Sequence, residues 1–398
     1  MLTSKERIRI ALEGGKPDRV PVAAVYGAGY IMRSAGRDIR EKSVCTAREW
    51  IESIEKSFLR HKQIDLFRLQ PGRPASAGSN LKVEKIEAYW RVTDTVSGER
   101  WGLLPDGSIC EFDGVRISRK AKQVFAEPRI RSEDDMDTVV GKVPDRAEME
   151  GRGTYGPLKY MVSKYPDYHF SSQIMCPFSK AVEYCGGYVE GLLCMKEDAT
   201  LFHKLLRRCT DIQIALTGFA KKSGADSVWF TSYYTGADTL SPELYKKEVF
   251  RYDLEICLAA KKLGLYVLHW YLGDLLPNIE TVMKLQMDAL VLEQGRKGYR
   301  IDPAEIRRIV GDRFCLFGFG NENDYCTGNT VSLESQLKYQ IKSAGKNGAF
   351  VAGTPVMPDN ARPEAVDFYF NTAFRLGDYT RESRKAYNGK ESARQNGG

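Results

Sequence analysis

The sequence predicts a single closed barrel of eight parallel strands that alternate with helices, a (β/α)8 fold in the α/β class. Short apolar runs recur along the 398 residues with helical segments between them, which indicates parallel strands joined by right-handed crossovers. Eight such runs fit one closed barrel, and barrels of this kind extend past ~250 residues as single domains. No glycine-rich nucleotide loop follows any run, so a doubly wound sheet is the less favoured alternative.

The first elements have recognisable ends. A helix is expected over 4–13, because the pair Gly14-Gly15 that follows is a typical helix C-terminus. The apolar run that starts near Val20 is the first predicted strand. A helical pattern then covers 46–61, and the run 64–69 is the second predicted strand.

The pattern changes over residues 87–125. Aromatic and polar residues alternate there, and turn signals occur at Ser97-Gly98 and Asp106-Gly107, which is typical of antiparallel hairpins. We interpret this stretch as an insertion in the barrel. The predicted organisation is therefore one barrel domain over 1–381 and a polar tail, 382–398, that we expect to be disordered.

Strands and helices alternate again after Pro144. Two of the helices have clear starts, at Ser241-Pro242-Glu243 and at the capping box that runs from Asp302 to Glu305. The remaining predicted strands are 168–175, 227–231, 266–271, 289–293, 314–318 and 349–352.

Composition excludes several classes of function. The net charge of +7 comes from interspersed positive and negative residues, so we predict no nucleic-acid groove. No stretch reaches the ~18 to 20 apolar residues that span a bilayer, and the charged N-terminal stretch indicates an amphipathic helix and no signal peptide. Nine cysteines without a CxxC pair suit reduced thiols, so we expect a cytoplasmic protein.

Functional residues of such barrels gather at the carboxyl ends of the strands. His269 follows the apolar run 265–268, and we interpret it as a ligand, acid or base; the alternative is a histidine that only shapes the strand end. Glu293 ends the run 289–292. A carboxyl group buried there has a raised pKa and is a candidate acid, unless it belongs to a structural ion pair.

Aromatic and amide side chains complete the predicted site. Tyr233 and Tyr234 offer stacking surface and phenol donors for an aromatic substrate, with ordinary core packing as the alternative. Asn321 follows the seventh strand. The hydroxyls of Thr231 and Ser232 have no evident base in the sequence, so we predict no serine nucleophile.

Several motifs in this order resemble the uroporphyrinogen decarboxylase superfamily over nearly the whole chain. Each motif alone is weak, and their order carries the resemblance, which implies the barrel fold. The motifs are Arg7 to Pro21, Cys176-Pro177-Phe178 with Gly187, Gly224-Ala225-Asp226, Leu240 to Tyr245, His269 with Gly273, Leu316-Phe317-Gly318 with Asn321, and Gly353 to Asp359.

The decarboxylases of this superfamily bind a tetracarboxylate through an arginine pair. The segment Met32 to Arg37 is similar to that motif, so Arg33 and Arg37 are predicted to clamp a substrate carboxylate; the alternative is a pair on a helix surface. Porphyrinogen decarboxylation is nevertheless disfavoured, because the family's other site positions differ here. They fall at Gln70, Glu183, Tyr233 and Thr354.

The methyltransferases of the superfamily act with a corrinoid protein, and many hold zinc on His-x-Cys and a further Cys. The matching positions here are His269, Tyr271 and Thr354, so the resemblance implies no zinc. The hairpin region around Asp94 and Trp101 resembles the methyltransferase branch.

The resemblance therefore implies a methyltransferase that demethylates a small methyl donor, such as an aryl methyl ether. The acceptor would be the corrinoid (cobalamin) of a partner protein docked over the barrel mouth, and a homodimer is among the expected assemblies. The alternatives are a decarboxylase or other lyase on a non-porphyrin carboxylate, and a non-catalytic ligand-binding barrel. The predicted acid residues are His269 and Glu293, and the predicted substrate-binding residues are Tyr233, Tyr234, Asn321, Arg33, Arg37 and Tyr271.

Overall fold

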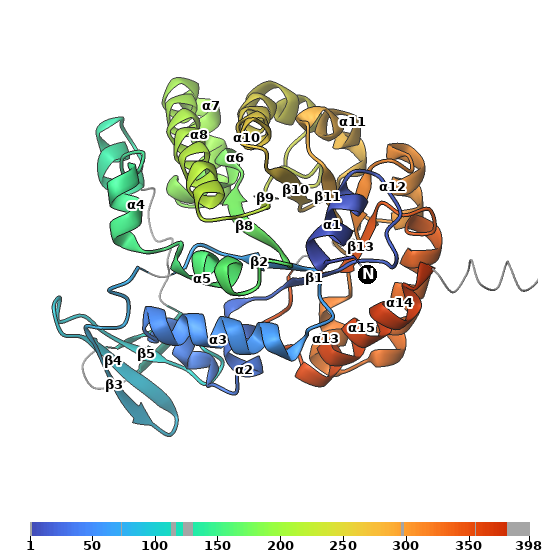
Figure 1. The fold of residues 1–398 in the computed structure, drawn as a ribbon. Coiled ribbons are helices and arrows are strands. Elements are labelled where there is room, and N and C mark those ends of the chain that lie inside the picture. Colours follow the sequence, from blue (N-terminus) through green and yellow to red (C-terminus); the bar gives the residue numbers. More distant parts are fainter. Residues whose placement is uncertain are drawn as a thin grey trace, which may run out of the picture.

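Eight parallel strands close into a barrel, which confirms the predicted fold class. The computed structural model describes residues 2–72, 74–112, 117–121, 130–295, 298–354 and 356–379. The strands follow one another around the barrel in the order β1-β13-β12-β11-β10-β9-β8-β2 (Figure 1). Their bounds are β1 Val22–Val25, β2 Leu66–Leu69, β8 His169–Met175, β9 Ser227–Ser232, β10 Tyr266–Tyr271, β11 Ala289–Val291, β12 Cys315–Phe317 and β13 Phe350–Gly353.

Helices surround the barrel, as the alternation of elements predicts (Figure 1). In the part of the chain that the structure describes, none of them is both long and apolar enough to cross a membrane. Their bounds are α1 Ser4–Leu12, α2 Ala28–Ser34, α3 Ala47–Arg60, α4 Arg146–Arg152, α5 Gly156–Lys164, α6 Pro177–Tyr184, α7 Tyr188–Glu197, α8 Ala199–Lys222, α9 Pro242–Leu244, α10 Phe250–Lys262, α11 Ile279–Val282, α12 Pro303–Val310, α13 Glu322–Thr327, α14 Thr330–Ala344 and α15 Pro363–Leu376.

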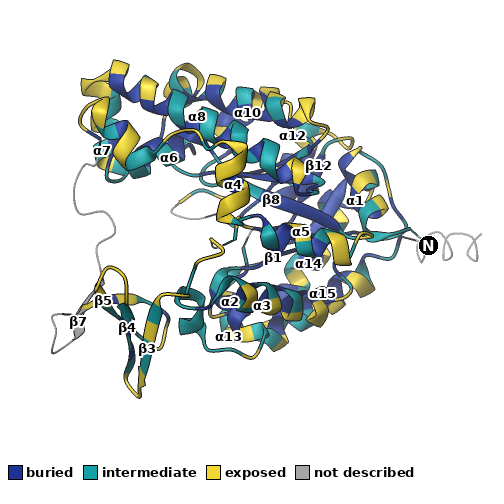
Figure 2. Cartoon of the chain, turned by 60° about the vertical axis from the view of Figure 1, so that its left-hand side comes forward, coloured by how far each residue is buried: buried dark blue, intermediate teal, exposed yellow. Residues whose placement is uncertain are grey.

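The predicted insertion is an antiparallel sheet of β3 Leu81–Ile86, β4 Tyr89–Asp94, β5 Arg100–Leu103, β6 Ile109–Phe112 and β7 Ile117–Ala121. It begins ahead of the predicted boundary at residue 87. The reason is that β3 is an edge strand with little buried surface, so its apolar residues give a weak signal. Figure 2 shows the sheet beyond α2 and α3, far from α1. The predicted end of the insertion at 125 and the tail 382–398 lie outside the described residues.

Side chains of the barrel strands alternate between two cores. One set faces the barrel interior and forms a cluster with α1; it includes Val25, Leu268 and Val291. The other set, which includes Val267 and Tyr271, packs against the surrounding helices. This period of two fixes which residues of each strand reach the interior.

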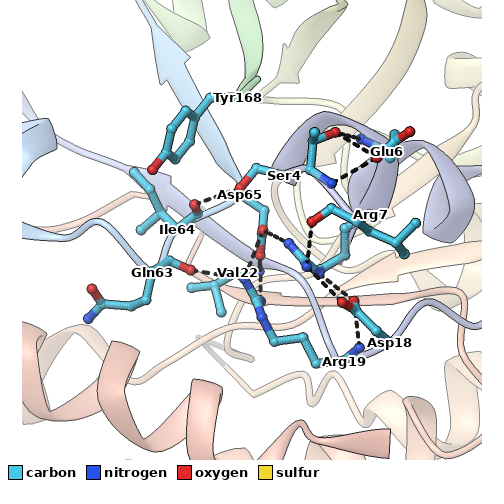
Figure 3. A network of polar contacts seen from close by, with 12 residues as sticks. Ser4, Glu6, Arg7, Asp18, Arg19, Val22, Gln63, Ile64, Asp65 and Tyr168 are labelled. Carbon is cyan, nitrogen blue, oxygen red and sulfur yellow. Dashed lines mark hydrogen bonds and ion pairs between the residues drawn. The ribbon is translucent and has the colours of Figure 1, made fainter. Parts of the chain in front are cut away.

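A network of charges closes the amino end of the barrel (Figure 3). Asp65, fully buried just before β2, accepts hydrogen bonds from Arg7 at 2.7 Å and from Arg19 at 2.7 and 2.9 Å. Arg7 also holds Asp18 at 2.6 and 2.9 Å, and that contact keeps the pKa of the Asp18 carboxyl below its usual range. Polar residues at this end of a barrel serve stability, so the functional site is expected at the opposite end.

Candidate functional site

The barrel interior opens at the carboxyl ends of β8 and β10. The interior-facing residues Gln173, Met175 and Trp270 are half-buried there, whereas the flanking outward residues Ile174 and Tyr271 are buried. Solvent therefore reaches the interior from this side, and these side chains define what we call the mouth of the barrel. The mouth coincides with the end where the fold class places its functional groups.

Arg68, on β2, places a charged side chain in this interior. Its side chain follows Leu66 by two residues and so faces inward, and the residue is only 4% exposed. One guanidinium nitrogen donates to Gln173 Oε1, while Nε is buried without a hydrogen-bond partner among the described residues. Within that part of the chain no carboxylate forms an ion pair with it. Burial lowers the pKa of Arg68 to about 10, which leaves the group charged at neutral pH.

Gln173 connects Arg68 to the half-buried side chains of the mouth. Its Nε2 donates to Met175 Sδ at 3.3 Å and lies 3.4 Å from Thr231 Oγ1. Tyr233 Oη donates to the same sulfur at 3.9 Å. The surroundings of the guanidinium are therefore amide, hydroxyl, thioether and phenol, and these groups bring no compensating negative charge.

Tyr233 and Tyr234 follow β9 and line this side of the mouth. Their rings lie 5.7 Å apart edge to face, and Tyr188 of α7 stacks on Tyr234 at 5.5 Å. Burial raises the pKa of Tyr233. Tyr234 has a φ of 67°, a strained conformation for a bulky residue, and such strain persists where the surroundings enforce it. The structure thus brings both predicted tyrosines to the mouth.

Glu293 reaches the same end of the barrel. It is 5% exposed, two residues beyond the inward-facing Val291, so the alternation points its side chain inward. Its Oε1 accepts from Gly273 N at 3.2 Å and from Tyr299 Oη at 3.1 Å. The predicted position of the carboxyl group is therefore consistent with a role at the mouth.

His269 faces away from the interior. It lies between Leu268 and Trp270, whose side chains point inward, and its ring packs on Phe230 and Tyr271 in the layer below the helices. Its Nε2 lies 2.9 Å from Ser232 Oγ, and burial lowers its pKa to about 3. A catalytic role for His269 stays a prediction, and the geometry favours the alternative of a neutral histidine that shapes the strand.

The other two positions that correspond to zinc ligands are also engaged elsewhere. Tyr271 Oη donates to Thr235 O at 2.5 Å and accepts from Asn278 at 2.7 Å. Thr354 Oγ1 donates to Val356 O at 3.3 Å. A phenol and a hydroxyl in these bonds, beside an outward-facing imidazole, do not fit a zinc ion, which prefers thiolate, imidazole and carboxylate ligands.

The remaining predicted residues lie apart from the interior. Asn321 caps α13 and borders a cavity of about 260 Å³ together with Gln294 and Phe319. Arg33 borders another hollow, of about 680 Å³, between α2 and the loop before α15. Arg37 lies just beyond the turn after α2 and forms ion pairs with Glu41 at 2.5 Å and Glu49 at 2.9 Å. The structure therefore does not bring Arg33 and Arg37 together as a clamp.

Arg68 is the functional candidate that the residue-by-residue prediction missed. The run 64–69 was recognised as a strand, and counting by two from Leu66 places Arg68 inside the barrel at the carboxyl end. A lone arginine in an apolar barrel strand was therefore an available signal. The partners of Arg68 come from other strands, so only the structure could show that no described carboxylate pairs with it.

Comparison with known proteins agrees with this architecture. The family model described as Uroporphyrinogen decarboxylase (URO-D) matches residues 114–373. A uroporphyrinogen decarboxylase of Chlorobium phaeovibrioides (strain DSM 265 / 1930) is 26% identical over 275 residues, covering 66% of this chain and 72% of the relative.

A solved structure of a methyltransferase from Methanosarcina mazei superimposes with a TM-score of 0.68 at 14% identity, over 94% of this chain and 99% of that one. At that identity the likeness shows the fold. The family match covers more than half of the sequence. The chain therefore belongs to the uroporphyrinogen decarboxylase (URO-D) family.

Proposed function

We propose that the chain is a methyltransferase that removes the methyl group of a small methyl donor and passes it to the corrinoid of a partner protein. Aryl methyl ethers are the donor class to test first. The observation that carries the proposal is the mouth itself: a thioether, an indole and two phenol rings, at Met175, Trp270, Tyr233 and Tyr234, surround the opening. Such a lining suits an aromatic ring with an apolar methyl substituent.

The reaction is a displacement at the methyl carbon. The electron pair of cobalt(I) forms the cobalt–carbon bond, the carbon–oxygen bond breaks, and the leaving oxygen takes its electrons. The role of this chain is to hold the donor with its methyl group toward the opening, where the corrinoid protein docks, and to supply a proton to the leaving oxygen. Positioning and proton donation each contribute large factors, with ~10² to 10⁴ typical for the acid.

Glu293 is the proposed acid of this site. The backbone N–H of Gly273 and the phenol of Tyr299 fix its Oε1 in place. The carboxyl group is 5% exposed and lies at the end of the barrel where the leaving oxygen of the donor would be held. His269 is not assigned this role, because it faces the helices.

A decarboxylase acting on a non-porphyrin carboxylate is the second candidate, because the lone guanidinium of Arg68 can bind a carboxylate. Carbon dioxide leaves as a neutral molecule, so a cation that binds the departing carboxylate stabilises the ground state more than the transition state. Arg68 therefore suits a carboxylate that is retained through the reaction better than one that is lost.

The test mixes the purified chain with a reduced corrinoid protein and a panel of methoxyarenes, and follows formation of the methylated corrinoid by its absorbance. We expect turnover by the wild type and a loss of ~10² to 10⁴-fold in Glu293→Gln. Arg48→Gln, a surface variant whose side chain is 89% exposed, is the control. Carbon dioxide release from methoxyarenes that carry a carboxylate, without methyl transfer, would contradict the proposal and support the second candidate.

A further inference from the structure

Arg68 combines three properties that seldom occur together. It is buried, it carries a charge, and it has no carboxylate partner in the part of the chain that the structure describes. An uncompensated buried charge is costly, and proteins normally pair it or let it bind a ligand. At the amino end of the same barrel Arg7 and Arg19 both pair with the buried carboxylate of Asp65.

The guanidinium offers donors that its surroundings leave unused. Its bond to Gln173 engages one nitrogen, and the buried Nε has no partner among the described residues. The indole Nε1 of Trp270, another interior residue, is buried and likewise lacks a described partner. Donors without acceptors on the walls of an interior indicate that the acceptor comes with the ligand.

We propose that Arg68 binds the carboxylate of the substrate and that the substrate class is a methoxylated aromatic carboxylate. The inference deepens the proposed function and rests on it for the methyl group, whereas carboxylate recognition stands on the Arg68 geometry. A planar guanidinium fork binds a carboxylate through two parallel hydrogen bonds, and Tyr233 with Tyr234 supplies ring contacts above it.

The depth of Arg68 also fixes how the substrate lies. Arg68 is 4% exposed, while Met175 and Trp270 nearer the opening are half-buried. The carboxylate therefore lies inward and the ring extends toward the mouth. A methoxy group para to the carboxylate then reaches the opening where cobalt approaches, and an ortho methoxy group stays beside Arg68, out of its reach.

Binding of 4-methoxybenzoate to the purified full chain, without a corrinoid protein, tests the inference by titration calorimetry. The matched neutral ligand is 4-methoxybenzamide. We expect the carboxylate to bind at least tenfold more tightly than the amide, because a hydrogen bond to a charged group contributes enough for about a 10- to 100-fold effect. Equal affinities, or no binding of the carboxylate, would overturn the inference. So would inorganic phosphate binding as tightly as the arenecarboxylate.

Variants locate the carboxylate. Arg68→Gln is expected to remove the preference for the carboxylate over the amide, and Arg68→Lys, which keeps the charge and loses the fork, to retain part of it. Arg48→Gln, which removes an exposed charge, should match the wild type. If Arg33→Gln loses the preference and Arg68→Gln keeps it, the hollow at α2 is the carboxylate site and the inference is wrong.

The two proposals fail separately. Carboxylate-selective binding without methyl transfer would leave Arg68 as the anion site and overturn the proposed function. Methyl transfer from neutral methoxyarenes at the same rate as from 4-methoxybenzoate would support the proposed function and overturn the substrate class. The wild-type comparison of acid and amide needs no variant, so a folding defect in Arg68→Gln leaves the inference testable.

Discussion

The two ends of the barrel treat buried arginines in opposite ways. Every donor nitrogen of Arg7 at the amino end has an acceptor, in Asp18, Asp65 or the carbonyl of Leu2 (Figure 3). Arg68, three residues after Asp65 along the same strand run, has Gln173 and no described carboxylate. The same side chain thus holds the fold together at one end and remains available to a ligand at the other. The difference teaches that partners, more than burial, distinguish a structural charge from a functional one.

The largest expected effect comes from breaking the amino-end network. Asp65→Asn removes the buried carboxylate that Arg7 and Arg19 share, which leaves Arg7 with Asp18 alone, and we expect the free energy of unfolding to fall by about 3–5 kcal/mol. Urea denaturation at pH 7 measures it. Glu52→Gln, in an exposed ion pair with Arg48, is the matched control and should cost less than about 1 kcal/mol. Equal costs would show that the network carries no special stability.

Asp253 extends the comparison to acidic residues, because it is a buried carboxyl group with no described cation as a partner. Asp253 of α10 is fully buried, and burial raises its pKa to about 7 from 3.8. The pKa of Asp253 is higher in the folded state than in the unfolded state. Its contribution to the free energy of unfolding is therefore complete below pH 4 and is lost as the pH rises through 7. Asp253→Asn does not titrate. We therefore expect it to exceed the wild type in unfolding free energy at pH 8.5, by on the order of 4 kcal/mol.

Unfolding of Asp253→Asn and the wild type at pH 5 and pH 8.5 separates this titration from a simple packing effect. A difference between the two proteins that is the same at both pH values would refute the titration. Tyr245 Oη, 3.2 Å from Asp253, keeps an acceptor in the variant, so the hydrogen bond itself is preserved.

Removing the charge of Arg68 should raise the free energy of unfolding, whereas removing the charge of Asp65 should lower it. Arg68→Met deletes a buried guanidinium that has no described carboxylate partner, so we expect the free energy of unfolding to rise by on the order of 1–2 kcal/mol while 4-methoxybenzoate binding is lost. Thermal and urea unfolding beside the binding titration measure both. A stability loss as large as that of Asp65→Asn would place Arg68 among the structural arginines.

The smallest effect concerns His269. Burial lowers its pKa to about 3, below the unfolded value of 6.5, so its contribution to stability is present above pH 6.5 and is lost as the pH falls. The glutamine of His269→Gln does not titrate, so at pH 5.5 the variant is expected to avoid a destabilisation of about 1 kcal/mol that the wild type undergoes. Turnover by the variant should stay within tenfold of the wild type. A loss of ~10² or more would restore the predicted role as an acid.

The fold was largely predictable because its signals are local. Each of the eight barrel strands was predicted from a short apolar run, and helix starts such as Thr46, which caps α3 with Glu49, follow from local hydrogen bonds. The edge strand β3 was missed for the converse reason. Its pairing to β4 depends on the neighbouring strand more than on its own residues.

The site was predictable only in part, because a strand end does not say which way a side chain faces. Glu293, Tyr233 and Tyr234 lie at the mouth, where they were expected. His269 was expected there too, but in the structure it is one residue out of phase with the inward-facing Leu268 and Trp270. The register of the strand relative to the interior decided the difference, and it is set by the closed barrel as a whole.

The most direct test of the central claim is a crystal structure of the chain with 4-methoxybenzoate bound. The account predicts both carboxylate oxygens within about 3 Å of the Arg68 guanidinium, with the methoxy group toward Met175 and the opening. A carboxylate seated in the hollow beside Arg33, or turned toward solvent with the methoxy group inward, would contradict it.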